Sequence, residues 1–205
     1  MKTIGITGGV GCGKSSLLEY IKNNYNCEIV MADDVGNKVK EPGERCYRQL
    51  IDLLGEAIID VNSREGFIDK KAMAAAIFAD EKLLKRVNDI IHPAVTEYIL
   101  QQRDLRKKEG KLDYFFIEAA LLIECGYRKY VDEMWFIYTK KELRTERLKK
   151  QRGYSDEKIE SIMASQLTDE EFEAGCDFTI DNSFSLEESF RQIDELLKQE
   201  KKIDC

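Results

Sequence analysis

GGVGCGKSS, residues Gly8 to Ser16, is the most informative stretch of this sequence. It matches the pattern G-x-x-x-x-G-K-[ST], with Gly8, Gly13, Lys14 and Ser15 at the defined positions. The apolar run KTIGIT before it predicts a buried strand, and LLEYIKNN after it predicts a helix from about Ser15. Glycines let the backbone wrap around a phosphate group without Cβ clashes, and N–H groups at a helix N-terminus point at the anion. The stretch therefore predicts a phosphate-binding loop.

The loop also predicts roles for individual residues. Lys14 is expected to reach the β- and γ-phosphates of a nucleotide, and Ser15 to offer its hydroxyl to Mg²⁺. Cys12 lies at a helix N-terminus, where a thiolate is favoured, so one hypothesis is that it reacts readily with alkylating reagents and is protected by MgATP. The alternative is a small residue that is present only because it fits the loop. A glycine-rich turn without a ligand is the alternative, but pattern and context both favour phosphate. The predicted ATP-binding residues are Gly9, Gly11, Cys12, Gly13, Lys14, Ser15 and Ser16.

Composition excludes several classes of protein. With 32 Lys and Arg against 39 Asp and Glu, the net charge of −7 argues against nonspecific binding to nucleic acid. No run of 18 apolar residues and no signal-peptide pattern is present, so we expect a cytoplasmic protein without a membrane partner. The cysteines form no C-x-x-C pair and are interpreted as reduced thiols rather than a disulfide framework or a zinc site. They are Cys12, Cys27, Cys46, Cys125, Cys176 and Cys205.

Short apolar runs that alternate with helical patterns predict an α/β fold with a parallel sheet. Beyond KTIGIT, strands are expected at CEIVMA (27–32), DYFFIEA (113–119), DEMWFIY (132–138) and DFTID (177–181), with a weaker signal at EAIIDV (56–61). Helices are expected at KKELRTERLKKQ, at SDEKIESIMASQ and over residues 185–202.

The spacing of these elements predicts one unit with insertions. Its core covers about residues 1–35, 112–143 and 167–205. Consecutive helices over about 36–111 form an insert, and residues 144–166 form a smaller one. The helices of the larger insert are expected to break near His92-Pro93, because proline disfavours the helical conformation of the residue before it.

Asp33 lies at the end of the second predicted strand, 19 residues beyond Lys14. The carboxyl ends of parallel strands meet at one edge of a sheet, where ligands bind. Asp33 could therefore act as a base on a nucleophile that attacks the γ-phosphate. The alternative is a cap of the helix that follows, a role for which Asp34 competes.

Two further residues are candidates for the site. Glu118 ends the third apolar strand, where it could bind substrate or magnesium, or be an ordinary strand-end carboxylate. His92 is the only histidine; without other His or Cys residues at ligand spacing, a metal role is not expected. A helix boundary or a substrate contact remains for it.

Arg144, Arg147 and Arg152 follow the fourth long strand. Arg144 and Arg147 are spaced to share a helix face. A positioned arginine can stabilise the charge that develops on a transferred phosphoryl group. The alternative is a solvated charged face, since several lysines surround these arginines.

The order of short motifs along the chain resembles the dephospho-CoA kinase family. The motifs are ITGGVGCGKSS, MADD (31–34), KEPG (40–43), IIHPAV (90–95), EAALLIE (118–124) and TIDN (179–182). The loop alone is shared by many NTPases, whereas the combination is much more specific and covers nearly the whole chain.

The resemblance implies an ATP-dependent kinase that phosphorylates the ribose 3′-hydroxyl of dephospho-CoA in the last step of coenzyme A synthesis. It implies a five-stranded P-loop core, a helical CoA-binding insert and a mobile lid. Asp33 matches the family's catalytic aspartate, and Arg147 matches an arginine of the lid. Both are therefore expected to be catalytic residues together with Lys14. The chain departs from the usual family pattern at Met31, Asn37, Glu118, Gln151 and Phe172.

Two other functions fit parts of the pattern. A nucleoside monophosphate kinase or another small-molecule kinase would share the core. A GTP-dependent switch would use D-x-x-G, which Asp33 to Gly36 matches, but no guanine-reading N-K-x-D motif is present.

Overall fold

A computed structural model describes residues 1–78 and 80–200. Lys201 and Lys202, at the end of the last predicted helix, and the Cys205 thiol lie outside the described residues. The elements in chain order are β1 (Lys2–Thr7), α1 (Lys14–Asn24), β2 (Cys27–Met31), α2 (Ala32–Lys38), α3 (Arg45–Leu54), the 3₁₀ turn η1 (Glu56–Ile58), α4 (Lys70–Ile77), α5 (Glu81–Glu109), β3 (Tyr114–Glu118), the 3₁₀ turn η2 (Tyr127–Tyr130), β4 (Glu133–Tyr138), α6 (Lys141–Arg152), α7 (Asp156–Ala164), α8 (Asp169–Gly175), β5 (Phe178–Asp181) and α9 (Leu186–Glu200).

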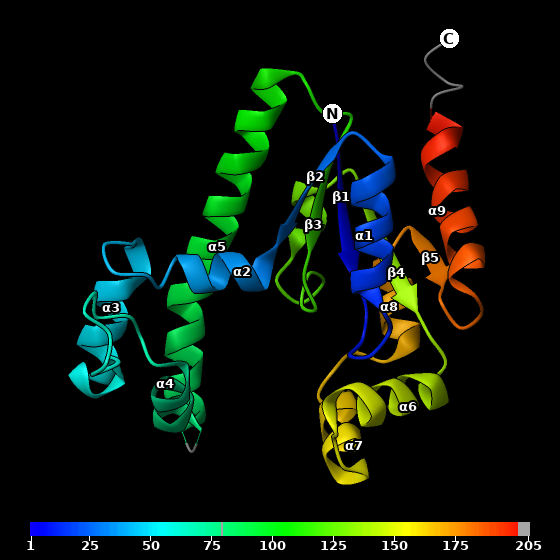
Figure 1. Cartoon of the computed structure of the whole chain (residues 1–205). Helices are drawn as coiled ribbons and strands as arrows, with labels where there is room; N and C mark the ends of the chain where they lie inside the picture. Colours follow the sequence, from blue (N-terminus) through cyan, green and yellow to red (C-terminus); the bar gives the residue numbers. More distant parts are fainter. Residues whose placement is uncertain (79, 201–205) are drawn as a thin grey trace. The chain divides into compact units, whose positions relative to one another are not determined.

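The described strands form one five-stranded sheet in the order β2-β3-β1-β4-β5 (Figure 1). β1 pairs in parallel with β3 on one side and with β4 on the other, and β4 pairs in parallel with β5. The predicted α/β class with a parallel sheet is confirmed. Because parallel strands end at the same edge, the residues after β1, β4 and β5 come together there.

Helices cover both faces of the sheet. On one face, Phe172 of α8 stacks on Phe136 of β4 with ring centroids 4.9 Å apart. Trp135 is adjacent to Phe136 in β4 and therefore points to the opposite face. On that face Trp135 packs against Phe116, and the Tyr114 hydroxyl donates a hydrogen bond to a carbonyl of α9. The strands are thus buried on both faces, which explains their nearly continuous apolar sequences.

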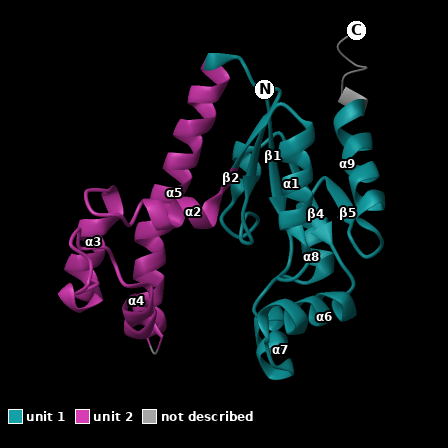
Figure 2. Ribbon diagram, viewed as in Figure 1, with its two compact units in different colours: residues 1–29, 109–205 teal, residues 30–108 magenta. Residues whose placement is uncertain are grey.

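The chain divides into two compact units, residues 1–29 with 109–205 and residues 30–108 (Figure 2). The first unit contains most of the sheet and the phosphate-binding loop. The second contains α2, α3, α4 and nearly all of α5, and its core includes Val39, Cys46, Leu50, Val87 and Ile99. Among residues 1–78 and 80–200, no helix is long and apolar enough to cross a membrane.

The expected helix break at Pro93 is wrong. α5 runs from Glu81 to Glu109 with Pro93 inside it. Proline in a helix interior costs about 3 kcal/mol, but Val87 before it and Val95 and Ile99 after it are buried along one side of the helix. Burial of each such side chain contributes roughly 1.5–3 kcal/mol, so packing outweighs the local preference.

Two smaller features also differ from the sequence predictions. EAIIDV does not form a strand: residues 56–58 form η1, and only an isolated bridge joins Ile59 to Ile68. α8 was not expected, although Thr168 and Glu171 form a capping box at its start. This T-x-x-E signal is readable in the sequence, but the helix has only 7 residues and lacks a clear periodic pattern.

Candidate active site

The predicted phosphate-binding loop, residues 8–13, connects β1 to α1. Gly13 precedes α1 in the left-handed conformation, with φ of 86°. A Cβ at this position would lie 2.5 Å from Nδ2 of Asn182, so both the backbone and the space require glycine. Ser15 and Ser16 follow in the exposed first turn of the helix. N–H groups at a helix N-terminus suit an anion, so phosphate binding by this turn stays a prediction.

Lys14 reaches back across the loop. Its Nζ donates a hydrogen bond to the carbonyl oxygen of Gly8 at 2.6 Å and lies 3.8 Å from Oε1 of Glu118. Glu118 ends β3 and is only 7% exposed. The structure therefore brings two of the predicted site residues together, at the carboxyl edge of the sheet. A role of Glu118 in binding substrate or metal stays a prediction.

The oxygen donors beside the loop are of the kind that Mg²⁺ prefers. Ser15 offers an exposed hydroxyl and Glu118 a carboxylate. Among the described residues, no group of three or more His, Cys, Asp or Glu side chains forms a metal cage. Mg²⁺ usually binds through one or two protein oxygens together with substrate phosphates, so these residues fit a nucleotide-bound ion.

The carbonyl oxygen of Cys12 accepts hydrogen bonds from three side chains. Thr139 Oγ1 donates at 2.9 Å, Asn182 Nδ2 at 2.8 Å and Arg147 Nη1 at 3.2 Å. Arg147 Nη2 also donates to the carbonyl oxygen of Asn182 at 3.1 Å. Only Arg147 was singled out from the sequence. Thr139 and Asn182 each directly follow a strand, and the strand-end rule that selected Asp33 would have found them.

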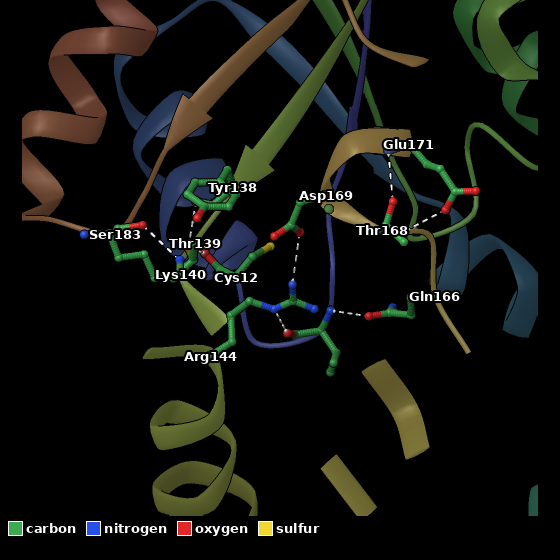
Figure 3. A network of polar contacts seen from close by, with 12 residues as sticks. Cys12, Tyr138, Thr139, Lys140, Arg144, Gln166, Thr168, Asp169, Glu171 and Ser183 are labelled. Carbon is green, nitrogen blue, oxygen red and sulfur yellow. Dashed lines mark hydrogen bonds and ion pairs between the residues drawn. The ribbon is translucent and has the colours of Figure 1, made fainter. Parts of the chain in front are cut away.

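Arg144 holds the other half of the loop (Figure 3). Its Nε donates a hydrogen bond to the carbonyl oxygen of Val10 at 3.0 Å, and its Nη1 lies 3.5 Å from Oδ1 of Asp169. The N–H of Val10 donates to Oε1 of Gln166 at 2.9 Å. No local pattern in the sequence marks Gln166 or Asp169, because both contacts join residues far apart in the chain.

The expected reactivity of Cys12 does not fit its burial. Cys12 is 2% exposed, so an alkylating reagent has no access to it in the folded protein. We expect Cys12 to be alkylated far more slowly in the native protein than in urea, with or without MgATP. Alkylation followed by peptide mass spectrometry would measure this. Fast native labelling of Cys12 that MgATP suppresses would contradict the expectation.

Asp33 and His92 belong to the second unit, residues 30–108. Asp33 is exposed in the first turn of α2. No side chain caps this helix, whose N-cap is Met31, so the capping roles considered for Asp33 and Asp34 are wrong. His92 lies inside α5 rather than at a helix boundary. A catalytic role of Asp33 and a substrate contact of His92 stay predictions.

Asp33 interacts electrostatically with Lys40 of its own unit. Burial lowers the pKa of Lys40, and the nearby charge of Lys70 lowers it further, whereas Cys46 and Asp33 act in the opposite direction.

Comparison with known proteins identifies the family. The model of the dephospho-CoA kinase family matches residues 2–188. A protein named dephospho-CoA kinase from Aquifex aeolicus is 32% identical over 199 residues, which are 97% of each chain. One of the same name from Geobacter sulfurreducens is 33% identical over 197 residues, 96% of this chain and 97% of that one.

Solved structures of kinases are also similar to this chain. Dephospho-CoA kinase from Campylobacter jejuni superposes with a TM-score of 0.71 at 25% identity, covering 97% of this chain and 98% of that chain. Shikimate kinase from Acinetobacter baumannii, with a TM-score of 0.53 and 11% identity over 97% of this chain and 94% of that chain, shares the fold of a P-loop kinase. On the strength of the family match and these relatives, the chain belongs to the dephospho-CoA kinase family.

Proposed function

We propose that this protein transfers the γ-phosphoryl group of ATP to the ribose 3′-hydroxyl of dephospho-CoA, which gives coenzyme A and ADP. The observation that carries the proposal is the family match over residues 2–188, which includes the complete loop GGVGCGKSS. The phosphate-binding geometry of the loop and the P-loop kinase fold support it.

The loop binds ATP. The N–H groups of Gly11 to Ser16 and the N-terminus of α1 hold the phosphates, and Lys14 leaves the carbonyl of Gly8 to reach the β- and γ-phosphates. Ser15 holds Mg²⁺ through its hydroxyl, with Glu118 as a neighbouring carboxylate. When bound, Mg²⁺ supplies neutralisation of the charge on these phosphates.

Asp33 is the general base. Its carboxylate accepts the proton of the 3′-hydroxyl as the bond from the 3′-oxygen to the γ-phosphorus forms. The bond between that phosphorus and the β,γ-bridging oxygen breaks, and ADP leaves with the electron pair. The insert of about residues 36–111 binds dephospho-CoA, with His92 as one of its contacts. The segment of about residues 144–166 is a lid that excludes water, which would otherwise compete for the phosphoryl group.

We expect ADP release from MgATP to depend on dephospho-CoA. The assay compares dephospho-CoA with AMP, CMP, adenosine and pantothenate, identifies the product by mass spectrometry, and includes EDTA as the test of Mg²⁺. ADP formed with dephospho-CoA alone, with coenzyme A as the product, is the expected result. ADP formed with another acceptor and not with dephospho-CoA would replace the substrate but keep the kinase. Turnover of GTP without an acceptor would instead indicate a switch.

A further inference from the structure

Arg144 and Arg147 lie one turn apart on α6 but contact opposite ends of the phosphate-binding loop. Arg147 Nη1 contacts Cys12, and a Cβ on Gly13 would lie 3.1 Å from it. Arg144 Nε contacts Val10, and a Cβ on Gly9 would lie 2.2 Å from its Nη2. Arg147 is thus at the end next to α1, and Arg144 is at the end next to β1.

The contacts of Arg147 are those of a structural brace. Both of its Nη atoms donate to groups of the protein, namely the carbonyls of Cys12 and Asn182 and the hydroxyl of Thr139. These acceptors hold the loop to the residues that follow β4 and β5. Three of the five N–H donors of this guanidinium are engaged in this way, and they come from both Nη atoms.

Arg144 is also held by contacts to the protein, but its Nη2 group has no hydrogen-bond partner among the described residues. The residue is 8% exposed, and its Nε and Nη1 are held by Val10 and Asp169. Its Nη2 forms no hydrogen bond within the described chain. Every fully buried side-chain nitrogen or oxygen of the described residues has a hydrogen-bond partner, so Nη2 reaches the protein surface. One N–H₂ group beside Gly9 is therefore without a partner in the part of the chain that the structure describes, and it is not completely buried.

Lys14 and Arg144 contact neighbouring residues at the start of the loop. The Nζ of Lys14 lies 2.6 Å from the carbonyl oxygen of Gly8, and Arg144 Nη2 lies against the next residue, Gly9. Two cations therefore contact the first two residues of the loop, and one of them is the lysine that reaches the β- and γ-phosphates in P-loop enzymes. Asp169 does not neutralise Arg144 strongly, because its side chain is 38% exposed and the pair is 3.5 Å apart.

We propose that Arg144 donates from Nη2 to the phosphoryl group as it is transferred, and that Arg147 braces the loop. The inference rests on the proposed function. During transfer the bond to the acceptor oxygen forms, the bond to ADP breaks and the proton goes to Asp33. The negative charge on the three equatorial oxygens meets the guanidinium of Arg144. An arginine in this role contributes about 10³–10⁵ in rate.

The test compares Arg144→Ala and Arg144→Lys with Arg147→Ala, and uses Lys150→Ala as the matched control. Lys150 is an exposed cation on the same helix. The measurements are kcat with dephospho-CoA, the Kd of ADP by calorimetry and the Tm. We expect Arg144→Ala to lower kcat by about 10³-fold while the Kd of ADP, which lacks the γ-phosphate, changes by less than about threefold. Added guanidinium should restore part of kcat in Arg144→Ala.

Arg147→Ala should instead weaken ADP binding and lower the Tm, and Lys150→Ala should match the wild type. A kcat of either Arg144 variant within threefold of the wild type would overturn the proposal. A parallel loss of kcat and ADP affinity without guanidinium rescue would also overturn it. That result would show that Arg144 only positions the loop through its bond to Val10. If Arg144→Ala does not fold, Arg144→Lys is used in its place. A loss of kcat that exceeds the loss of ADP affinity supports the proposal, and equal losses overturn it. A wild type that phosphorylates only another acceptor refutes the proposed substrate, and the same comparison is then made with that acceptor.

Discussion

Replacing Asp33 with alanine is expected to lower kcat by about 10²–10⁴-fold, the usual contribution of a positioned general base. The binding of ATP should stay nearly unchanged, because the loop that holds ATP belongs to the other unit. The Tm should also be preserved, since Asp33 is exposed and does not cap α2. Steady-state kinetics, calorimetry with ATP and thermal melting measure the three quantities.

Asp34→Ala is the matched control for Asp33. Asp34 is the next residue, it is equally exposed, and it lies in the same first turn. If the charge near the start of α2 were all that mattered, the two variants would behave alike. A near-wild-type kcat of Asp33→Ala would remove Asp33 from the mechanism, and Asp33→Asn would show whether the shape of the side chain suffices without its charge.

Replacing Lys14 with alanine is expected to lower kcat by about 10²–10³-fold, comparable to the loss of one donor that stabilises a transition-state charge. It should also weaken ATP binding more than ADP binding. Lys22→Ala, an exposed lysine later in α1, serves as the control. Isotope-based ATP turnover and calorimetry with both nucleotides measure these effects.

Lys14→Ala should lower stability as well, because the buried carboxylate of Glu118 loses a nearby cation. The double variant Lys14→Ala with Glu118→Gln separates the two effects. We expect it to recover part of the lost Tm while kcat stays low. Recovery of kcat in the double variant would show that Lys14 acts by neutralising Glu118 and not by contacting phosphate.

The strands and the loop were predictable from the sequence because their signals are local. A continuous apolar run predicts a buried strand, and the pattern around Lys14 carries its own mechanism. The side chains that shape the loop were not predictable in the same way. Arg144 and Val10 are 134 residues apart, and Val10 and Gln166 are 156 apart. Such pairs depend on how the strands are ordered in the sheet, which periodicity does not specify.

The error at Pro93 has the opposite origin. The local preference against helix was read correctly, but it is worth only about 3 kcal/mol and a long buried side of α5 outweighs it. Arg147 was predicted from the family motif. The Nη2 of Arg144, which has no partner within residues 1–78 and 80–200, was not predictable, because it depends on which long-range acceptors each guanidinium group meets. Local rules thus predicted the loop, and long-range contacts determine which side chains hold it.

The shape of the loop depends on a residue that is synthesised long after the loop itself. Cys12 is near the start of the chain, yet one donor to its carbonyl oxygen is Asn182, which lies 170 residues later. A nascent chain that ends before Phe178 contains all of GGVGCGKSS but lacks this bond and β5, the strand that precedes Asn182. We therefore expect C-terminal truncations that remove β5 and Asn182 to weaken nucleotide binding even though they leave the loop sequence intact.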